Sequence, residues 1–490
     1  MRRLMRSWLS GMVVAAAAGV AIGASAQSAE AMTGVAPAAA VPRFSAPAVS
    51  SIPEDAGDES IVAADFNGDG TSDLAMPDDP IILVLLGKGN GAFHRPAEYR
   101  VGFGLGDLTV ADLNGDGRPD IAARGGRGVS VLLNDGAGRF PHHTSFAAPG
   151  TAVALAAADV NLDGKVDLLT ANLRSQELSV FVGQGAGHFG PARTFSGLGA
   201  GALAVGDING DGRPDVALSG VIVRPNRLVP GPVSVRLGRG DGTFGPDQAV
   251  AGVHSGPQTV TLTDLNPDGK LDLLVQPVRG RASFVLLGKG DGTFAPPSSV
   301  TFGRRQPLFT LVADFNMDGG PDIAADRPDA AMVVAAGRGD GSFGRQQPLS
   351  GDPGVGSGAV GDFNGDGRPD LASVEEAACD STMEGCFRQD TVNHLVTWLN
   401  WTGLPAPPCM PPDLERFVPT RNSERTGLFA RIRLRRAKRD LKASGCRVGH
   451  VRRRVSREDR NVVIAQRPRT GAVLPSHARV DLVVSRGRRR

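Results

Sequence analysis

Apolar and polar residues alternate in short runs along most of the chain, and clusters of Asp, Asn and Gly separate the runs. Ser60–Phe66, Asp73–Met76 and Ile81–Leu86 show the pattern where it first appears. Runs this short, bounded by turn residues, are typical of β-strands. The 66 Gly and 35 Pro among 490 residues favour many turns. The chain is therefore predicted to be mainly β.

One nine-residue pattern, Asp-x-Asn-x-Asp-Gly-x-x-Asp, recurs seven times between these runs. Its copies begin at intervals of 47 to 57 residues, and all seven keep the Asn, the Gly and the three Asp. Repetition at this period predicts a repeat architecture in which each copy marks one supersecondary unit. The opening residues are Asp65, Asp112, Asp159, Asp207, Asp264, Asp314 and Asp362.

The chemistry of the pattern favours calcium. Positions one, three, five and nine offer side-chain oxygens, the Gly permits a positive φ, and the seventh carbonyl can then turn inward. Oxygen ligands in a tight loop suit Ca²⁺, so up to seven structural Ca²⁺ are predicted. The expected ligands are Asp65, Asn67, Asp69, Thr71, Asp73; Asp112, Asn114, Asp116, Arg118, Asp120; Asp159, Asn161, Asp163, Lys165, Asp167; Asp207, Asn209, Asp211, Arg213, Asp215; Asp264, Asn266, Asp268, Lys270, Asp272; Asp314, Asn316, Asp318, Gly320, Asp322; and Asp362, Asn364, Asp366, Arg368, Asp370.

Two other interpretations of the loops are weaker. An EF-hand needs a Glu at the twelfth position, and the first copy has Met76 there, with no Glu in the other six copies. A tight turn without a metal would leave three carboxylates repelling one another. Residues Gln27 to Pro408 contain 27 basic and 44 acidic residues, a net charge of −17, which seven Ca²⁺ would reduce to −3. The acidity is therefore read as calcium chemistry.

A second repeat lies between the loops. Gly-x-Phe ends at Phe93, Phe140, Phe189, Phe244, Phe294 and Phe343, and each copy is followed by one more short strand. The seventh loop has no such motif after it, but Pro42–Pro47 before the first loop is similar to Gly242–Pro246. The N-terminus is therefore expected to supply the missing strand of the last unit, which closes a ring without a free sheet edge.

These units resemble the FG-GAP / VCBS repeats of integrin α-subunit-like β-propellers, a fold used in cell adhesion. The resemblance covers residues 43–402 and implies seven blades of four strands, with calcium in the loop that joins the first two strands of each blade. Two segments depart from the regular unit, an insertion near Val221–Pro232 and the Cys379–Cys386 loop. Insertions of this kind lie in loops and are candidate partner contacts.

The N-terminal residues 1–26 are typical of a secretory signal peptide. Arg2, Arg3 and Arg6 precede an apolar run from Leu9 to Gly23, and Ala24-Ser25-Ala26 forms a cleavage site. Residues 27–42 are expected to be a linker, and the mature protein to be secreted or associated with the cell wall. In an exported chain four cysteines favour two disulfides. Cys379 and Cys386 are the preferred local pair, and Cys409 and Cys446 flank the start of the tail.

The tail has the opposite charge to the body, with 23 basic and 7 acidic residues from Cys409 to Arg490, a net charge of +16. Residues 403–433 are read as a linker and the start of a tail domain. Leu434, Ala437 and Leu441 have helical spacing, and strands are expected near Val462–Gln466 and Val480–Val484. This order resembles a PASTA domain over residues 434–490, with Cys409 tied to it, which implies an α+β module that docks on peptidoglycan or an anionic wall polymer. A solvated basic surface is the alternative.

No catalytic motif is found, whether a zinc His-Glu-x-x-His, a Gly-x-Ser-x-Gly elbow or a phosphate-binding loop. The chain is expected not to be an enzyme but a calcium-binding propeller with an extracellular protein or glycan partner. Tyr99, Trp398 and Trp401 are the few aromatic platforms for sugar in the body, so a protein partner is favoured. Export and the lack of stacking residues in the tail argue against nucleic acid as a partner. A propeller-based polysaccharide lyase or hydrolase is the rival hypothesis.

Overall fold

The structure is a computed structural model of the 490-residue chain. It describes residues 42–45, 48–52, 56, 60–126, 128–173, 175–197, 201–224, 227–253, 257–277, 282–303, 307–327, 330–349, 354–378, 391–400, 402, 417–419, 429–431, 447–454, 463–467 and 479–485. All regular elements in these residues are β-strands. No helix in the described part of the chain is long and apolar enough to cross a membrane.

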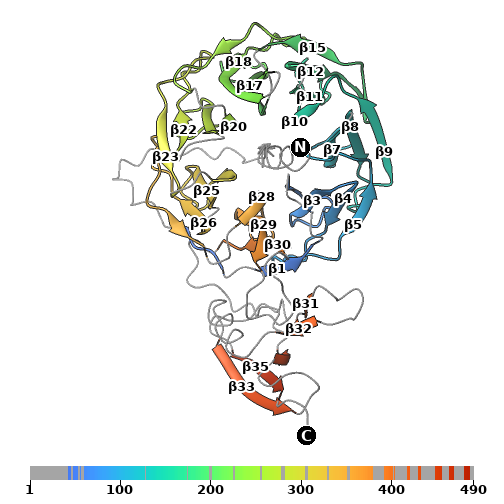
Figure 1. Ribbon diagram of the computed structural model, residues 1–490, viewed down its shortest axis with the longest axis vertical. Helices are drawn as coiled ribbons and strands as arrows, with labels where there is room; N and C mark the ends of the chain where they lie inside the picture. Colours follow the sequence, from blue (N-terminus) through green and yellow to red (C-terminus); the bar gives the residue numbers. More distant parts are fainter. Residues whose placement is uncertain are drawn as a thin grey trace, which may run out of the picture.

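Seven four-stranded antiparallel sheets stand as blades around a central axis (Figure 1). Blade 1 contains β2 (Val62–Ala64), β3 (Asp73–Asp78), β4 (Ile81–Leu85) and β5 (Ala97–Arg100). Blade 2 contains β6 (Leu108–Ala111), β7 (Asp120–Gly125), β8 (Gly128–Leu133) and β9 (His142–Ala147). Blade 3 contains β10 (Ala152–Ala158), β11 (Asp167–Asn172), β12 (Glu177–Phe181) and β15 (Arg193–Ser196), with the short pair β13 (Gly183–Gly185) and β14 (His188–Phe189) beside it.

The second half of the ring repeats the arrangement. Blade 4 contains β16 (Leu203–Gly206), β17 (Asp215–Arg224), β18 (Arg227–Arg236) and β19 (Gln248–Ala249). Blade 5 contains β20 (Pro257–Thr263), β21 (Asp272–Pro277), β22 (Ala282–Leu286) and β23 (Ser298–Thr301). Blade 6 contains β24 (Thr310–Ala313), β25 (Asp322–Arg327), β26 (Ala330–Ala335) and β27 (Gln347–Pro348).

Blade 7 closes the ring with strands from both ends of the propeller. Its sheet has the order β1 (Ala48–Ser51), β30 (Thr391–Trp398), β29 (Asp370–Ala378) and β28 (Gly354–Gly361), and β1 pairs antiparallel with β30. Phe44 forms a bridge with Asn400, as Phe93 does with Gly87 in blade 1. The N-terminal segment therefore replaces the missing Gly-x-Phe unit, and this prediction is confirmed.

The core lies between facing blades rather than inside any one blade. Phe66 and Ile82 of blade 1 pack with Leu108 and Phe140 of blade 2 in one buried cluster. The burial of the strands agrees with a core between blades. All residues of β11 and β21 are buried, so both faces of these strands are covered. The Gly-x-Phe side chains belong to these interfaces, and the ring of Phe140 stacks edge-on against Phe66 at 5.4 Å.

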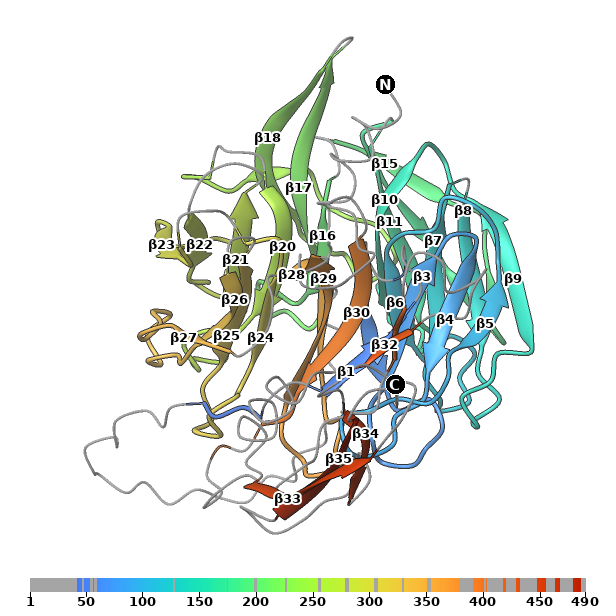
Figure 2. The same cartoon turned by 60° about the horizontal axis from the view of Figure 1, so that its bottom comes forward.

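The insertion near Val221–Pro232 lengthens two strands and is not a loop. β17 and β18 continue their pairing to Arg224 and Arg227, and the hairpin stands out from the ring (Figure 2). In each blade the second strand begins at the acidic loop and ends at the opposite face of the ring. The hairpin between β17 and β18 therefore projects from the face opposite the acidic loops. The expectation that insertions lie in loops is therefore wrong for this segment.

Beyond the propeller the structure describes two short pieces of sheet. β31 (Phe417–Pro419) pairs with β32 (Phe429–Arg431), and β33 (Arg447–Arg454), β35 (Arg479–Ser485) and β34 (Val463–Arg467) form a three-stranded sheet in that order. Strands near Val462–Gln466 and Val480–Val484 are thus present. The leader, the Leu434–Leu441 helix, Trp401 and all four cysteines lie outside the described residues.

Candidate calcium loops and an inter-blade pocket

All seven acidic loops occupy the same place, between the first and second strands of a blade. The first copy joins β2 to β3, and the last joins β28 to β29. The sixth-position Gly has φ between 77° and 87° in every copy, as the sequence pattern predicted. The structure therefore places all the expected ligands of each copy within one tight turn.

The first six positions of each loop wrap around the opening carboxylate. In the first copy Asp65 Oδ1 accepts hydrogen bonds from the amides of Gly68 and Asp69, and Asp65 Oδ2 accepts one from Gly70 at 2.8 Å. Asn67 Oδ1 accepts from the amide of Asp69 at 2.9 Å. The side chains are thus turned inward by the loop's own backbone, and their oxygens keep further lone pairs.

The ninth-position Asp is the buried member of each set. All seven of these side chains are fully buried, and both carboxylate oxygens accept backbone amides. Asp73 accepts from Phe66 N at 2.9 Å and from Gly87 N at 2.6 Å, so it ties the acidic loop to the start of the Gly-x-Phe turn. The same pair of bonds recurs at Asp120, Asp167, Asp215, Asp272 and Asp370. At Asp322 the first donor is the amide of the third loop residue, Asn316, instead of the second. This structural role was not foreseen from the sequence.

Burial raises the pKa of these carboxylates above the ordinary value of an Asp. It raises the pKa of Asp73, Asp120 and Asp322 to about 6 and that of Asp370 to about 8, and the neighbouring loop carboxylates raise it further, against the lowering effect of the backbone bonds. The pKa of Asp167, Asp215 and Asp272 is raised for the same reasons. A buried carboxylate beside two others lacks a compensating charge, and a bound cation would supply it.

The donor set of each loop fits a hard divalent cation, with carboxylate, amide and carbonyl oxygens in one turn. Among the described residues no three His, Cys, Asp or Glu side chains already converge as a preformed metal cluster. Asp65 Oδ1 accepts the amide of Asp69, and Asp69 Oδ1 accepts the amide of Thr71 instead. The fit therefore rests on chemistry and burial, and calcium remains a prediction.

Several of the loops also accept hydrogen bonds from a neighbouring blade. The amide of Gly138 in blade 2 donates to the carbonyl of Phe66 in the first loop at 3.0 Å, and Gly91 of blade 1 donates to Phe363 of the seventh loop at 3.0 Å. Asn134 and Asn400 add side-chain bonds of 2.8 Å to the carbonyls of Phe66 and Phe315. A change in a loop is thus transmitted to a blade interface.

In calcium-free buffer we expect the melting temperature to fall by several degrees as the pH rises from 5 to 8. The folded carboxylates with raised pKa bind protons more tightly than the unfolded chain, whose Asp have an ordinary value of 3.8. Their stabilising effect is complete below that value and is lost as the pH rises through about 6 and about 8. Thermal melts of the chelated and desalted chain test this. Excess Ca²⁺ should remove or reverse the trend, since the cation replaces the protons. A melting temperature that does not change with pH in the absence of calcium would contradict this prediction.

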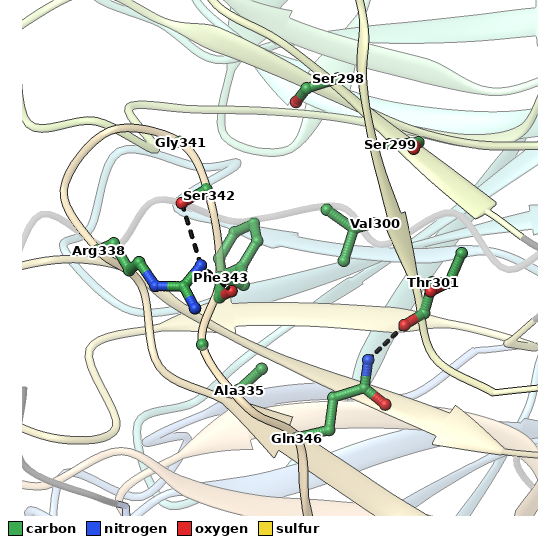
Figure 3. Close-up of a pocket in the computed structure, with 11 residues that line it drawn as sticks. Ser298, Ser299, Val300, Thr301, Ala335, Arg338, Gly341, Ser342, Phe343 and Gln346 are labelled. Atoms are coloured by element: carbon green, nitrogen blue, oxygen red, sulfur yellow. Dashed lines mark hydrogen bonds between the residues drawn. The ribbon is translucent and has the colours of Figure 1, made fainter.

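A separate concave site lies between blades 5 and 6. It has a volume of about 330 Å³ and is lined by β23 and by the Gly-x-Phe turn of blade 6. In Figure 3 the Phe343 ring faces Val300, and Gln346 reaches across the interface to the carbonyl of Thr301. Arg338 donates from Nη1 to Ser342 Oγ at 3.3 Å and to the Phe343 carbonyl at 2.5 Å, so the guanidinium is held at the pocket wall.

The pocket lining was missed in the sequence, because hydroxyls such as Ser298 and Ser299 come from a different blade and carry no motif. Two of the three aromatic residues considered as sugar platforms lie in the described part of the chain, and both take part in packing between blades. Trp398 is fully buried in the core, and Tyr99 packs edge-on against Phe140 at 5.5 Å. His142 and His143 lie exposed on the outer strand β9.

A family model described as an FG-GAP-like repeat matches the chain in four places, at residues 65–123, 112–170, 160–218 and 314–373. None of the curated proteins compared matches the sequence. These ranges include six of the seven acidic loops, and the remaining loop, which begins at Asp264, has the same position and the same buried ninth Asp as the matched ones.

Among solved structures, the BP39L lectin from Burkholderia pseudomallei is similar, with 18% identity and a TM-score of 0.52 over 71% of this chain and 96% of that one. A lectin from Agrocybe aegerita that recognises non-reducing terminal N-acetylglucosamine has 22% identity and a TM-score of 0.45 over 61% of this chain and 81% of that one. BBS1N, solved in complex with ARL6DN, has 10% identity and a TM-score of 0.47 over 74% of this chain and 98% of that one. Similarity at these levels concerns the fold alone.

Proposed function

From a seven-blade β-propeller that carries FG-GAP-like repeats, we propose a calcium-stabilised binding protein that is secreted or held at the cell wall. The observation that supports it best is the sevenfold recurrence of an oxygen-rich loop with a buried ninth Asp at every blade interface. The partner is an extracellular macromolecule, a protein or a glycan.

Calcium would be held in each loop by the side chains at positions one, three, five and nine and by the carbonyl at position seven. In the first loop these are Asp65, Asn67, Asp69, Asp73 and the carbonyl of Thr71. The ion supplies positive charge to buried carboxylates and performs no reaction here. The chain's own contribution is to keep neighbouring blades in register through the loop carbonyls that the next blade bonds.

The pocket between blades 5 and 6 is taken as a candidate site for the partner. Its walls combine hydroxyl groups, one guanidinium, one amide and the ring of Phe343. Such a pocket suits a ligand that combines polar groups with an apolar surface, such as a sugar unit or a polar protein side chain. We favour binding over catalysis because the lining includes no pair of acid and base residues.

Replacing Arg338 is expected to weaken partner binding about tenfold, which corresponds to about 1.4 kcal/mol. The exposed guanidinium is fixed by Ser342 and Phe343 at the wall of the pocket, so its loss removes a positioned donor. Lys289→Ala is the matched control, since Lys289 has the same place in the Gly-x-Phe turn of blade 5. Glycan arrays and capture of extracellular proteins, each with calcium, measure the effect. Equal losses in both variants would mean that the pocket is not the site.

The basic tail is proposed to associate with the wall. Co-sedimentation of the full chain with purified bacterial cell walls tests the whole proposal, with Ca²⁺ and with chelator. Pelleting that needs calcium and is lost in Arg338→Ala supports a wall partner of the propeller. Pelleting that is independent of calcium supports the tail as the anchor. If nothing pellets, the wall role fails, and assays for polysaccharide cleavage test the alternative of a propeller-based lyase or hydrolase.

A further inference from the structure

The three-stranded tail sheet has two unlike faces. Along β35 every second side chain is fully buried, namely Val480, Leu482 and Val484. Strand alternation puts Arg479, Asp481 and Val483 on the other face. Arg479 is exposed, so this second face meets solvent.

The strand register gathers arginines on the solvent face. Arg447 of β33 lies directly opposite Arg479 of β35 in a parallel pair, and an irregularity between Val448 and Val451 then brings Arg452 opposite Val483. Arg447 and Arg452 are both exposed. On the other side of β35, the backbone of β34 places Arg467 opposite Asp481. Four arginine positions thus surround one acidic residue on a single face.

The charge on this face is not balanced within the described sheet. The described side chains on this face include Arg447, Arg452 and Arg479 and a single acidic residue, Asp481. Asp481 Oδ1 accepts the amide of His450 at 2.6 Å, and that bond, the His450 side chain and the charge of Arg452 hold the pKa of Asp481 below its usual value. Like charges directly opposite one another, as at Arg447 and Arg479, destabilise a sheet unless an anion lies between them.

We propose that this face, defined by the exposed Arg447, Arg452 and Arg479, binds a phosphodiester-linked polymer that lacks bases. The proposal rests on the wall association proposed above and names the chemistry that the tail recognises. A guanidinium pairs with phosphate oxygens through two parallel hydrogen bonds. Each exposed pair contributes little, so several neighbouring arginines favour a chain of repeated charges over a single ion.

The geometry also separates this polymer from nucleic acid. Binding of single-stranded nucleic acid depends on aromatic side chains that stack on the bases. The described strands of the tail sheet contain no Phe, Tyr or Trp. A charged polymer without bases makes no stacking contacts, so the lack of aromatic side chains does not weaken its binding to this surface. Same-face positions about 7 Å apart along a strand, and about 5 Å apart between strands, match phosphates separated by a short polyol.

The test uses the full chain and synthetic poly(glycerol phosphate) in a binding titration at several salt concentrations. Arg447→Ala with Arg479→Ala should weaken binding at least tenfold and make the salt dependence shallower by about two counter-ions. Arg95→Ala with Arg100→Ala removes the same charge from exposed positions of the propeller and should change affinity less than twofold. Equal weakening by the two double variants would overturn the proposal, since net charge alone would then explain binding.

Two further polymers test whether the tail recognises phosphate groups. Thermal melting with and without calcium separates this inference from the proposed function. Equal or tighter binding of poly-L-glutamate would overturn the phosphate assignment, and tighter binding of oligo(dT) would replace it with nucleic acid. The tail variant should keep the melting temperature of the wild type and its gain with Ca²⁺. If polymer binding is absent while the calcium gain remains, this inference fails and the propeller proposal stands. If the calcium gain is absent while the polymer binds, the reverse holds.

Discussion

Millimolar calcium is expected to raise the melting temperature of the chelated full chain by about 10 °C. Weak sites with Kd of about 0.1–1 mM each stabilise the folded state by about 1 kcal/mol at a few millimolar Ca²⁺. Seven such loops add about 7 kcal/mol. Unfolding of a propeller of roughly 360 residues has an entropy of about 0.75 kcal/mol per degree, which gives the expected shift.

Matched variants show whether the loops are responsible. Replacing the opening Asp of three loops, Asp112, Asp159 and Asp207, by Ala should remove about three sevenths of the gain with calcium. The control replaces three exposed Asp of the Gly-x-Phe turns, Asp241, Asp291 and Asp340, and so removes the same charge from the same face. The control should keep the full gain. Calcium binding by the loops would be refuted by a gain that falls equally in both variants, or by no gain in the wild type.

Deletion of residues 1–53, which removes β1, is expected to lower the melting temperature by about 10 °C and to cause self-association. The lost contacts include the pairing of β1 with β30, the bond from Ser45 N to Leu399 O at 2.8 Å and the burial of Ile52. About six hydrogen bonds and one buried side chain amount to roughly 7 kcal/mol. The deletion also leaves the edge of β30 unpaired, and an unpaired edge recruits other strands.

A shorter deletion supplies the control for ring closure. A chain that begins at Pro42 keeps Phe44, whose ring packs at 5.7 Å from Phe315, and all of β1. It should melt as the full chain does and remain in the same oligomeric state. Thermal melting and light scattering after gel filtration measure both variants. If the longer deletion behaves like the shorter one, β1 does not close the ring.

The repeated motifs made the propeller predictable before any coordinates. A loop that must turn back on itself needs Gly at one place and short polar side chains around it, so Gly70 and its six equivalents are visible in the sequence. Ring closure was predictable for a related reason, because Pro42–Pro47 supplies a unit that the seventh repeat lacks. Local backbone requirements of this kind leave a mark on each copy.

The insertion in blade 4 shows where such reasoning fails. Val221–Pro232 contains several apolar and β-branched residues, which are compatible with a strand. The interval between motifs gives the number of inserted residues, but it does not show whether they pair with another strand. Whether extra residues form a loop or lengthen β17 and β18 depends on the register between the two strands. The position of Trp398 was open for the same kind of reason, because only packing against blade 6 makes it core.

The sequence by itself determined the number of units, the acidic loops, the strand content and the opposite charges of body and tail. Each of these features depends on residues close in sequence or on simple counts, so it can be predicted without knowledge of tertiary contacts. The tertiary structure alone decided that the ninth Asp joins two loops in the core, that a pocket forms between β23 and Arg338, and that Arg447 stands beside Arg479. These features bring together residues from different strands or blades, and their partners are set by strand register and blade packing, which local patterns do not encode.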